Sequence, residues 1–276
     1  MKIIDGTAIA KEMLDELKLQ IKETNLSPKL AVILVGDDPA SKIYLKSKEA
    51  ACSHVGIKYE KYLLPNSASQ AELLELIKEL NESDVNAILL QVPLPKGIDE
   101  GTSLEAIDPL KDADGFHPIN LGRLLIGDES IAPATPSAVI EILKRINVEI
   151  SGKHSVIVGR SNIVGKPLAA MLLNRDATVT VCHSKTRNMA KITREADILA
   201  VAVGKPHFIT PEMVKEGAVV IDVGINRVGD RTVGDVDFEK VKEKASAITP
   251  VPGGVGPMTV ACLMKHVFLL ALAQRG

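Results

Sequence analysis

Hydrophobic residues recur with two alternating periods through the first half of the chain. Residues 6–24 carry apolar side chains at helical spacing, and LAVILV (30–35) then forms a continuous apolar run. Such a run, bounded by Pro28 and by GDDP (36–39), is typical of a strand buried on both faces. The same reasoning predicts helices over about 39–55 and 69–81 and strands over 57–64 and 87–92. Helices that alternate with strands indicate a parallel or mostly parallel sheet.

The alternation resumes after a loop-rich stretch at 108–125. Thr135 and Pro136 have the residue types of an N-cap and a first-turn proline, so we expect them to open a helix. A second series then begins at His154, with expected strands SVIVG, 177–182, 197–204 and 218–224, a helix over 165–175 and a closing helix over about 256–274. We therefore predict an α/β fold of two domains, one over residues 1–120 and one over 140–255, with the closing helix (256–276) packed back on the first.

Composition and charge exclude several classes of partner. Hydrophobic residues make up 46% and charged residues 25% of the chain, as in ordinary globular proteins. The net charge of −2, the 3% aromatic content and the absence of Trp give no support for nucleic-acid binding. The longest apolar runs, LAVILV and VFLLALA (267–273), are too short to span a bilayer, and MKIIDGTAIAKEM lacks the apolar region of a signal peptide. We expect a cytoplasmic protein with no nucleic-acid or membrane partner.

Cysteine and histidine spacing argues against a disulfide framework and against a metal centre. Cys52, Cys182 and Cys262 are odd in number and far apart, which fits free thiols in a reducing compartment. The six His residues show no H-x-x-x-H or similar spacing. We expect no metal.

The stretch VGRSNIVGKP (158–167) lies between a predicted strand and a predicted helix, where a phosphate-binding turn is expected. It departs from G-x-G-x-x-G, because Ser161 replaces the second glycine and Gly165 comes one residue late. Gly159 permits a tight turn, Gly165 permits close packing of helix on strand, and Ser161 adds a small hydroxyl donor. A pyrophosphate here would meet helix N–H groups and the positive end of the helix dipole. The spacing alone also fits a glycine-rich turn that binds no nucleotide.

The next strand of this series ends in CHSKTR (182–187), without the acidic residue that hydrogen-bonds the ribose 2′-hydroxyl of NAD. Ser184, Lys185 and Arg187 stand there instead, and Arg160 lies in the preceding loop. Cationic and hydroxyl groups suit a 2′-phosphate, so the sequence predicts NADP. Alternatively, Lys185 and Arg187 form only a solvated helix start.

The first half carries a second set of candidate residues. Tyr44 and Lys48 are four residues apart in SKIYLKSKEA, so they share a helix face and form a candidate proton-transfer pair, or else are surface residues. Gln91 ends a buried strand at the carboxyl edge, where α/β sheets bind ligands. Asp114 lies in a loop rich in turn residues. The Gly- and Pro-dense TPVPGGVGPMT (249–259) fits either a pocket wall or a rigid turn.

Eight motifs follow one another along the chain: YLKSK, QVPLP, DGFHPIN, GRSNIVGKP, CHSKT, DVGIN, GDV and TPVPGGVGPMT. Over nearly the whole chain they resemble the bifunctional methylenetetrahydrofolate dehydrogenase/cyclohydrolase family. The resemblance implies two α/β domains flanking a cleft, the second a Rossmann-type domain that binds NADP, and a homodimer. It also implies NADP-dependent oxidation of 5,10-methylenetetrahydrofolate, followed by hydrolysis of the 5,10-methenyl product to 10-formyltetrahydrofolate in one-carbon metabolism.

The resemblance implies roles for individual residues, carried over motif by motif. Lys48 is the expected catalytic lysine, Tyr44 its neighbour at the one-carbon unit, and Gln91 the group that orients Lys48. Asp114 is expected to grip the pterin, and with Tyr44 and Gln91 it counts both as catalytic and as substrate-binding. The resemblance further implies a folate pocket lined by Gly253, Gly254 and Pro257, and a cofactor bound by Gly159, Arg160, Ser161, Ser184 and Ile225.

Two positions depart from the family pattern. The chain has PATP (133–136) where the family has PCTP, and Lys265-His266 where it has an Asn-Thr pair. Neither position carries an expected catalytic role. Two rival interpretations are another two-domain NADP-dependent dehydrogenase, which requires a carboxylate-binding cation in the first domain, and an inactive NADP-binding protein, in which loss of Lys48 or of the proline-glycine loop is expected.

Overall fold

The structure is a computed structural model that describes residues 1–275, without the side chains of residues 39–43. The chain divides into two compact units. The six-stranded unit comprises Met1–Lys11, Leu124–Glu129 and Thr135–Thr259. The three-stranded unit comprises Glu12–Arg123, Ser130–Ala134 and the chain from Val260 onward.

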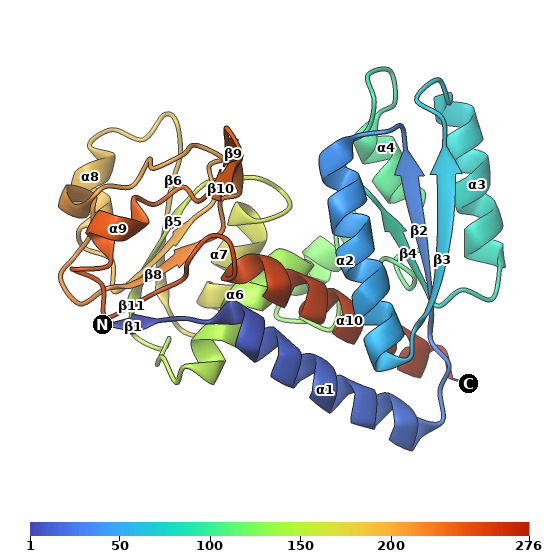
Figure 1. Cartoon of the computed structure of the whole chain (residues 1–276), viewed down its shortest axis with the longest axis horizontal. Helices are drawn as coiled ribbons and strands as arrows, with labels where there is room; N and C mark the ends of the chain where they lie inside the picture. Colours follow the sequence, from blue (N-terminus) through green and yellow to red (C-terminus); the bar gives the residue numbers. More distant parts are fainter. Residues whose placement is uncertain (276) are drawn as a thin grey trace. The chain divides into compact units, whose positions relative to one another are not determined.

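The six-stranded unit is built on one parallel sheet in the order β1-β11-β8-β7-β5-β6 (Figure 1). Its strands are β1 (Lys2–Ile3), β5 (His154–Val158), β6 (Thr178–Cys182), β7 (Ile198–Val201), β8 (Val219–Asp222) and β11 (Ala247–Ile248). The strand order reverses at β5, which pairs with β6 on one side and β7 on the other. Ligands bind outside the carboxyl ends of the strands at such a reversal.

Short helices and one hairpin complete this unit. The helices are α6 (Ala134–Arg145), α7 (Gly165–Leu173), α8 (Met189–Thr193), α9 (Phe238–Val241) and a 3₁₀ turn, η1 (Pro211–Met213); the antiparallel hairpin is β9 (Asn226–Val228) with β10 (Arg231–Val233). The apolar strands β7 and β8 are buried along their whole length, because helices or turns cover the sheet on the strands' apolar faces.

The three-stranded unit holds the parallel sheet β3-β2-β4. The strands are β2 (Lys29–Val35), β3 (Lys58–Leu64) and β4 (Ala87–Leu90); the helices are α2 (Pro39–Val55), α3 (Gln70–Glu82), α4 (Glu100–Glu105) and most of α5 (Pro118–Leu125). In Figure 1, α2 and α3 lie on either side of these strands. Residues 111–113 extend the sheet beyond β4, since the Ile88 N–H donates to the Lys111 carbonyl at 2.6 Å and the Ala113 N–H donates to the Ile88 carbonyl at 3.1 Å.

Two helices of 19 residues each, α1 (Gly6–Thr24) and α10 (Val255–Ala273), begin in the six-stranded unit and continue in the three-stranded one. By length and composition α10 could cross a membrane, with a mean hydropathy of 1.7 over its 18-residue window. The short run VFLLALA therefore understated the apolar length of this helix. Because 61% of the window is buried inside the protein, its composition is that of a core helix.

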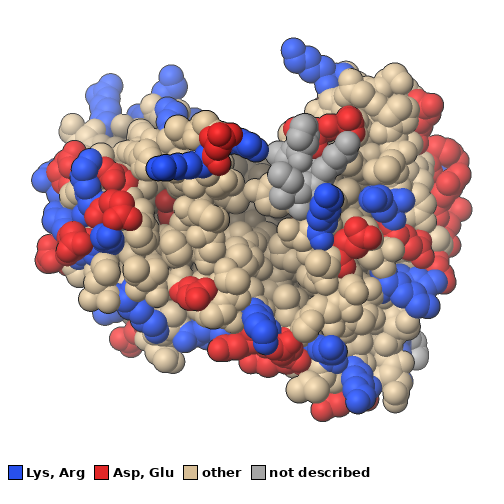
Figure 2. Space-filling model, viewed as in Figure 1, with Lys and Arg blue, Asp and Glu red and all other residues tan. Residues whose placement is uncertain are grey.

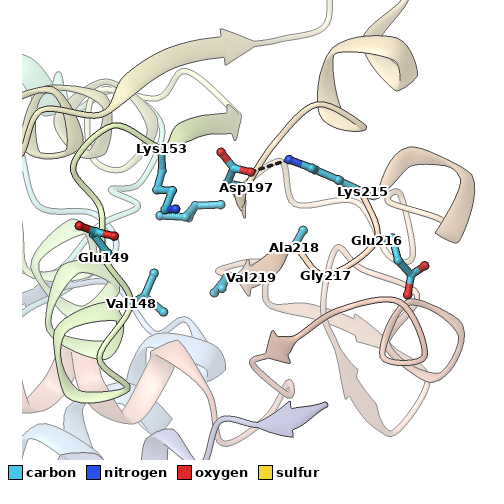
Figure 3. A pocket seen from close by; sticks show the side chains of 10 residues that line it. Val148, Glu149, Lys153, Asp197, Lys215, Glu216, Gly217, Ala218 and Val219 are labelled. Atoms are coloured by element: carbon cyan, nitrogen blue, oxygen red, sulfur yellow. Dashed lines mark hydrogen bonds and ion pairs between the residues drawn. The ribbon is translucent and has the colours of Figure 1, made fainter.

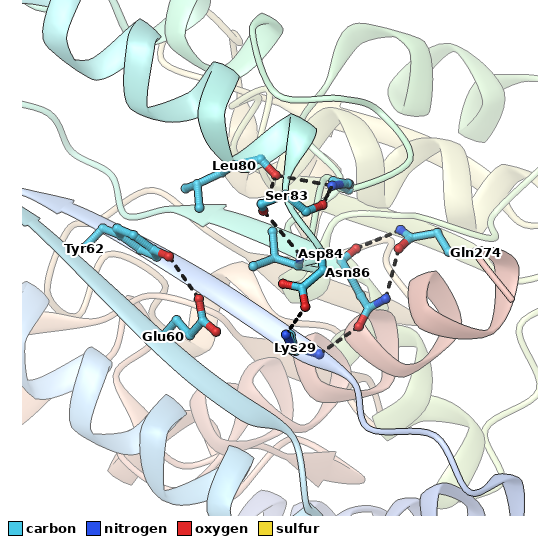
Figure 4. A network of polar contacts seen from close by, with 10 residues as sticks. Lys29, Glu60, Tyr62, Leu80, Ser83, Asp84, Asn86 and Gln274 are labelled. Carbon is cyan, nitrogen blue, oxygen red and sulfur yellow. Dashed lines mark hydrogen bonds and ion pairs between the residues drawn. The ribbon is translucent and has the colours of Figure 1, made fainter.

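Polar contacts fix the end of α10 to the amino edge of the three-stranded sheet (Figure 4). The Gln274 side-chain amide donates to the carbonyls of Asn86 and Leu110, each at 2.9 Å, and accepts from the Asn86 amide at 3.0 Å. Lys29, the first residue of β2, is paired with Asp84 at the same edge. These bonds attach the last turn of α10 to the strands that carry the first candidate site.

The predicted α/β class with parallel sheets is confirmed, and the predicted helices over 6–24 and 39–55 coincide with α1 and α2. The predicted cap at Thr135 is wrong, because α6 already begins at Ala134 and Thr135 lies inside its first turn. The short elements β1, β9, β10 and β11 were not predicted. Strands of two or three residues show too few alternations for a sequence pattern to reveal them.

Candidate active site

A lysine–glutamine pair joins α2 to the carboxyl end of β4. Lys48 lies one turn after Tyr44 on α2, and its ammonium donates to the Gln91 side-chain oxygen at 2.9 Å. Gln91 directly follows β4, and its N–H donates to the Ile33 carbonyl of β2 at 2.9 Å. Its amide nitrogen donates to the Val92 carbonyl at 2.8 Å, which leaves the amide oxygen to face the lysine.

Asp114 and Lys48 influence each other's protonation. Burial raises the pKa of Asp114 to about 6, with the Lys48 charge opposing the rise and the Asp112 charge adding to it. Burial lowers the pKa of Lys48 below its usual value, although the Asp114 charge acts in the opposite direction. Tyr44 is 38% exposed, and partial burial raises the pKa of its phenol, so it stays a neutral hydroxyl. A lysine of lowered pKa beside a carboxyl group suits proton transfer near neutrality.

Asp112, which sequence reasoning missed, organises the loop that carries Asp114. Its buried carboxylate accepts from the N–H groups of Gly115 at 3.0 Å and His117 at 2.8 Å, and from the Asn120 side-chain amide at 3.0 Å. Gly115 packs so closely on Ala132 that a Cβ would lie 2.7 Å from the Ala132 carbonyl carbon. The sequence shows only a second aspartate in KDADG, and nothing marks which of the two is buried.

Helix α10 packs against α2 and against the loop that carries Asp114. Cys52 of α2 contacts Met264, with the two sulfur atoms 3.3 Å apart. His266 is 5% exposed and hydrogen-bonds the backbone of Ala113, the residue before Asp114. Its Nδ1 has no hydrogen-bond partner among the described residues. Burial lowers the pKa of His266 to about 4, so the imidazole is neutral at physiological pH.

The proline-glycine loop belongs to the six-stranded unit. The Gly253 carbonyl accepts from the Thr7 N–H at 3.1 Å, and a Cβ on Gly6 would lie 1.9 Å from the Gly254 carbonyl oxygen. Close backbone packing against the start of α1 therefore requires glycine. Gly254 is buried, whereas Gly253 and Pro257 are partly exposed. The expected folate-binding residues thus fall into two sets, with these three in one unit and the lysine set in the other.

The turn after β5 has the compactness of a phosphate-binding loop. A Cβ on Gly165 would lie 2.2 Å from the Gly159 carbonyl oxygen, so the turn closes directly on the first residue of α7. Gly159 has φ +133, and a Cβ there would meet the Ala202 carbonyl oxygen at 2.3 Å. The Ser161 hydroxyl accepts from the N–H groups of Val164 at 3.1 Å and Gly165 at 3.4 Å. Its own proton is therefore available to an anion above the helix start.

The turn after β6 presents polar groups at the neighbouring position. Its backbone is fixed locally, because the His183 N–H donates to the Thr186 hydroxyl at 2.9 Å and the Lys185 N–H donates to His183 Nδ1 at 3.1 Å. Ser184 and Lys185 are exposed, as is Arg160 in the turn after β5. Since β5 and β6 are adjacent parallel strands, both turns lie at the carboxyl ends of the strands, on the same side of the sheet. Ser184 and Arg160 are therefore brought to one edge.

Ile225 completes this edge. It lies between β8 and β9 and is 47% exposed, an unusual state for an isoleucine. A Cβ on Gly256 would lie 4.0 Å from its side chain, so Ile225 lies near the start of α10. The turns after β5, β6 and β8 thus hold all five expected cofactor residues.

A separate cavity of about 410 Å³ lies at the amino ends of the strands of the same sheet (Figure 3). Lys153, Asp197 and Ala218, at its wall, immediately precede β5, β7 and β8. Lys215 reaches across to Asp197 at 2.5 Å. This cavity is at the amino ends of the strands, so it is remote from the turns that carry the expected cofactor residues.

Charges are mixed on the face drawn in Figure 2, where Lys and Arg alternate with Asp and Glu over both units. Among the residues described, no group of three or more His, Cys, Asp and Glu side chains is arranged to hold a metal ion. The three cysteines are buried, and none of them forms a disulfide in the described part of the chain.

The arrangement matches two family models. Residues 4–114 match the catalytic domain of tetrahydrofolate dehydrogenase/cyclohydrolase, and residues 133–275 match its NAD(P)-binding domain. The chain is 55% identical over 275 residues to the bifunctional protein FolD of Methanococcoides burtonii, covering 98% of this chain and 96% of that protein.

Solved structures agree over the full length. The FolD methylenetetrahydrofolate dehydrogenase/cyclohydrolase of Campylobacter jejuni is 49% identical, with a TM-score of 0.96 and 99% of each chain covered. The Trypanosoma brucei enzyme, solved with NADP cofactor and inhibitor, is 40% identical with a TM-score of 0.95, covering 99% of this chain and 98% of that one. The family expected from the sequence motifs is confirmed: this chain belongs to the tetrahydrofolate dehydrogenase/cyclohydrolase family.

Proposed function

We propose that this chain oxidises 5,10-methylenetetrahydrofolate with NADP and hydrolyses the 5,10-methenyl product to 10-formyltetrahydrofolate. The observation that carries this proposal is the bond from Lys48 to Gln91, together with the charge of the partly buried Asp114 acting on the lysine, in a chain of this family. A lysine held in this way is a proton-transfer group, and no purely nucleotide-binding protein requires one.

In the oxidation, the methylene carbon bridges N5 and N10 of the folate, and their lone pairs assist the departure of hydride. NADP, when bound, supplies the acceptor for that hydride. The residues that would hold it are Gly159, Arg160, Ser161, Ser184 and Ile225. Gly159 would admit the pyrophosphate, and Arg160 and Ser184 would bind the 2′-phosphate. The protein's part in this step is positioning.

In the hydrolysis, water adds to the methenyl carbon, and Lys48 as the free amine takes the proton that the water loses. The resulting ammonium returns a proton to N5 as the C–N5 bond breaks. The hydroxyl group on the same carbon loses its proton to solvent as the formyl C=O forms, and 10-formyltetrahydrofolate leaves. Gln91 fixes the lysine, and Tyr44 donates a hydrogen bond at the one-carbon unit. Burial lowers the pKa of Lys48, which favours the free-amine form that can act as a base.

Asp114 binds the pterin through its N–H groups, and Gly253, Gly254 and Pro257 line the folate pocket. We assign the folate-binding catalytic domain to residues 1–120 together with the helix at 256–276, and the NADP-binding domain to residues 140–255. The enzyme acts in the cytoplasm as a homodimer. Light scattering tests the last point: a mass near 29.5 kDa, that of one chain, would exclude the dimer.

The test of both activities is the absorbance of the methenyl species. Mixing the protein with methylenetetrahydrofolate and NADP should produce that absorbance and then lose it as hydrolysis proceeds. Supplying methenyltetrahydrofolate directly should give only the decay, at a rate above that in buffer. An inactive NADP-binding protein produces neither signal, and a dehydrogenase for another substrate leaves the folate unchanged.

A further inference from the structure

Two buried aspartates close the base of the β9–β10 hairpin. Asp222 is the last residue of β8, and Asp235 follows β10. Asp222 is 2% exposed and Asp235 is 0% exposed. Within the part of the chain that the structure describes, neither carboxylate forms a salt bridge with a lysine, arginine or histidine. Buried carboxylates are held by hydrogen bonds or ion pairs, so the groups that satisfy them identify what they do.

Asp222 binds the backbone on either side of the hairpin. Its Oδ1 accepts from the N–H groups of Gly224 and Asp235, each at 3.0 Å, and its Oδ2 accepts from the Val236 N–H at 2.9 Å. A Cβ on Gly234 would lie 1.9 Å from Oδ2, so the backbone runs directly against the carboxylate. Asp222 thus joins the exit of the hairpin to the end of β8.

Asp235 binds the turn that follows the neighbouring strand β7. Its Oδ2 accepts from the N–H groups of Val203 at 2.6 Å and Gly204 at 3.0 Å. Its Oδ1 accepts from the Lys205 N–H at 2.7 Å and from the Asn226 side-chain amide at 2.9 Å. Three consecutive N–H groups pointing at one carboxylate form an anion-binding nest, occupied here by a side chain of the same protein.

The two carboxylates connect the turns expected to hold the cofactor. The turn after β7 begins at Ala202, whose carbonyl oxygen contacts Gly159 of the phosphate-binding turn. Asn226 is the residue after Ile225. Through these contacts Asp235 links the turn after β5 to the turn after β8, across the intervening β7.

We propose that Asp235, anchored by Asp222, is a positioning residue for the dinucleotide: its carboxylate sets the turn after β7 and Ile225 at the spacing that the cofactor requires. This inference rests on the proposed function. Asp235 itself is fully buried, so it acts through the N–H groups that it binds and does not touch the cofactor.

The chemistry requires a carboxylate, because four donors converge on two oxygens. An asparagine has one acceptor oxygen, and its NH₂ group would face two of the N–H donors. Asp235→Asn should therefore raise the KM for NADP by about ten-fold or more, as expected when a buried charge-assisted contact is lost. Hydrolysis of supplied methenyltetrahydrofolate should stay within about two-fold of the wild-type rate, because general acid–base catalysis by Lys48 does not use the cofactor.

The experiment measures three quantities for each variant: the KM for NADP, the rate of methenyl hydrolysis and the thermal midpoint. Asp230→Asn is the matched control, because Asp230 is exposed in the tip of the same hairpin and should change none of them. If Asp235→Asn does not fold, Asn226→Ala removes one donor to the same carboxylate and should still raise the KM for NADP several-fold.

The outcomes separate the possible roles. A raised KM for NADP with hydrolysis retained supports positioning. Loss of both activities in proportion to unfolding shows that the aspartate is merely structural, and an unchanged KM for NADP in the folded variants overturns the inference alone. Wild-type protein that forms no methenyl species with NADP overturns the proposed function, and this inference with it.

Discussion

At the scale of single residues, the Lys48 ammonium donates to Gln91 and is influenced by the charge of Asp114, and it is the group to which we assign proton transfer. Lys48→Met should lower the rate of methenyl hydrolysis by at least a hundred-fold, since general acid–base groups contribute about 10²–10⁴-fold. NADP binding should survive, because the turns expected to bind it belong to the other unit. Decay of supplied methenyltetrahydrofolate measures the first quantity and a binding titration the second; hydrolysis within a few-fold of wild type contradicts the assigned role.

The protonation of Asp114 predicts a pH dependence. Its pKa of about 6 means that the carboxylate form, which accepts from pterin N–H groups, is present above that pH and is lost as the pH falls through it. The value of kcat/KM for hydrolysis should therefore decline on the acid side of about pH 6. In Asp114→Asn the activity should be low and this acid limb absent. An unchanged limb in the variant would assign the titration to another group.

We expect single side chains to set the choice between NADP and NAD as well. Arg160 and Ser184 are exposed at adjacent turns of one sheet edge, where a 2′-phosphate would bind. Arg160→Ala should remove most of a preference for NADP over NAD, because a charge-assisted contact to phosphate contributes about 1.5–3 kcal/mol. The comparison is kcat/KM for the two cofactors in both proteins. Equal kcat/KM values for NADP and NAD in the wild-type protein would contradict the prediction.

At the scale of elements, α10 reaches the catalytic loop through His266. This is a base whose pKa is lowered from 6.5 to about 4 in the folded protein. The neutral His266 imidazole contributes stability that is fully present above pH 6.5. This stability is lost as the pH falls toward 4, because His266 binds a proton in the unfolded chain but not in the folded protein. The loss amounts to about 3 kcal/mol.

His266→Gln should flatten this part of the stability curve, measured by urea unfolding between pH 4 and 7. The glutamine amide can still hydrogen-bond the Ala113 backbone, so the variant should fold. His207→Asn is the control, since His207 is exposed and asparagine tolerates its positive φ of 53°. A wild-type curve with no difference from the His266 variant contradicts the prediction.

Sequence patterns identified the long elements and not the short ones, for a physical reason. Helices such as α1 and α2 repeat the amphipathic period several times, whereas β9 and β10 contain three residues each. The hairpin is specified by Asp222 and Asp235, whose bonds form only after the flanking strands have assembled. Local sequence propensity does not reveal such long-range contacts. The motif GDV, which contains Asp235, could therefore be listed from the sequence but given no role.

In the candidate site, too, some residues could be identified from local sequence and others depend on long-range packing. Tyr44 and Lys48 share a helix face that spacing reveals, and the turn from Gly159 to Gly165 was identified from glycines between a strand and a helix. Their roles, however, came from resemblance to a family. Asp112 was not predicted, and His266 was noted only as a departure from the family pattern, because sequence does not distinguish a buried aspartate or histidine from an exposed one.

At the scale of the whole molecule, neither unit is a continuous piece of chain. The six-stranded unit includes β1, whose Lys2 and Ile3 pair with Ala247 and Ile248, and the three-stranded unit includes the greater part of α10. Non-local pairing of this kind adds loop-closure entropy that must be overcome before the contact stabilises anything. The independent stability of either unit therefore depends on chain segments from both ends of the sequence.

The pairing of β1 with β11 has a consequence for the order of synthesis. Strand β1 lies at the edge of its sheet, and its partner β11 is made some 245 residues later in synthesis. Because synthesis runs from the N-terminus to the C-terminus, β1 has no partner strand until translation has passed Ile248. A nascent chain halted before Ala247 should leave Lys2 and Ile3 accessible to protease, and the finished chain should protect them.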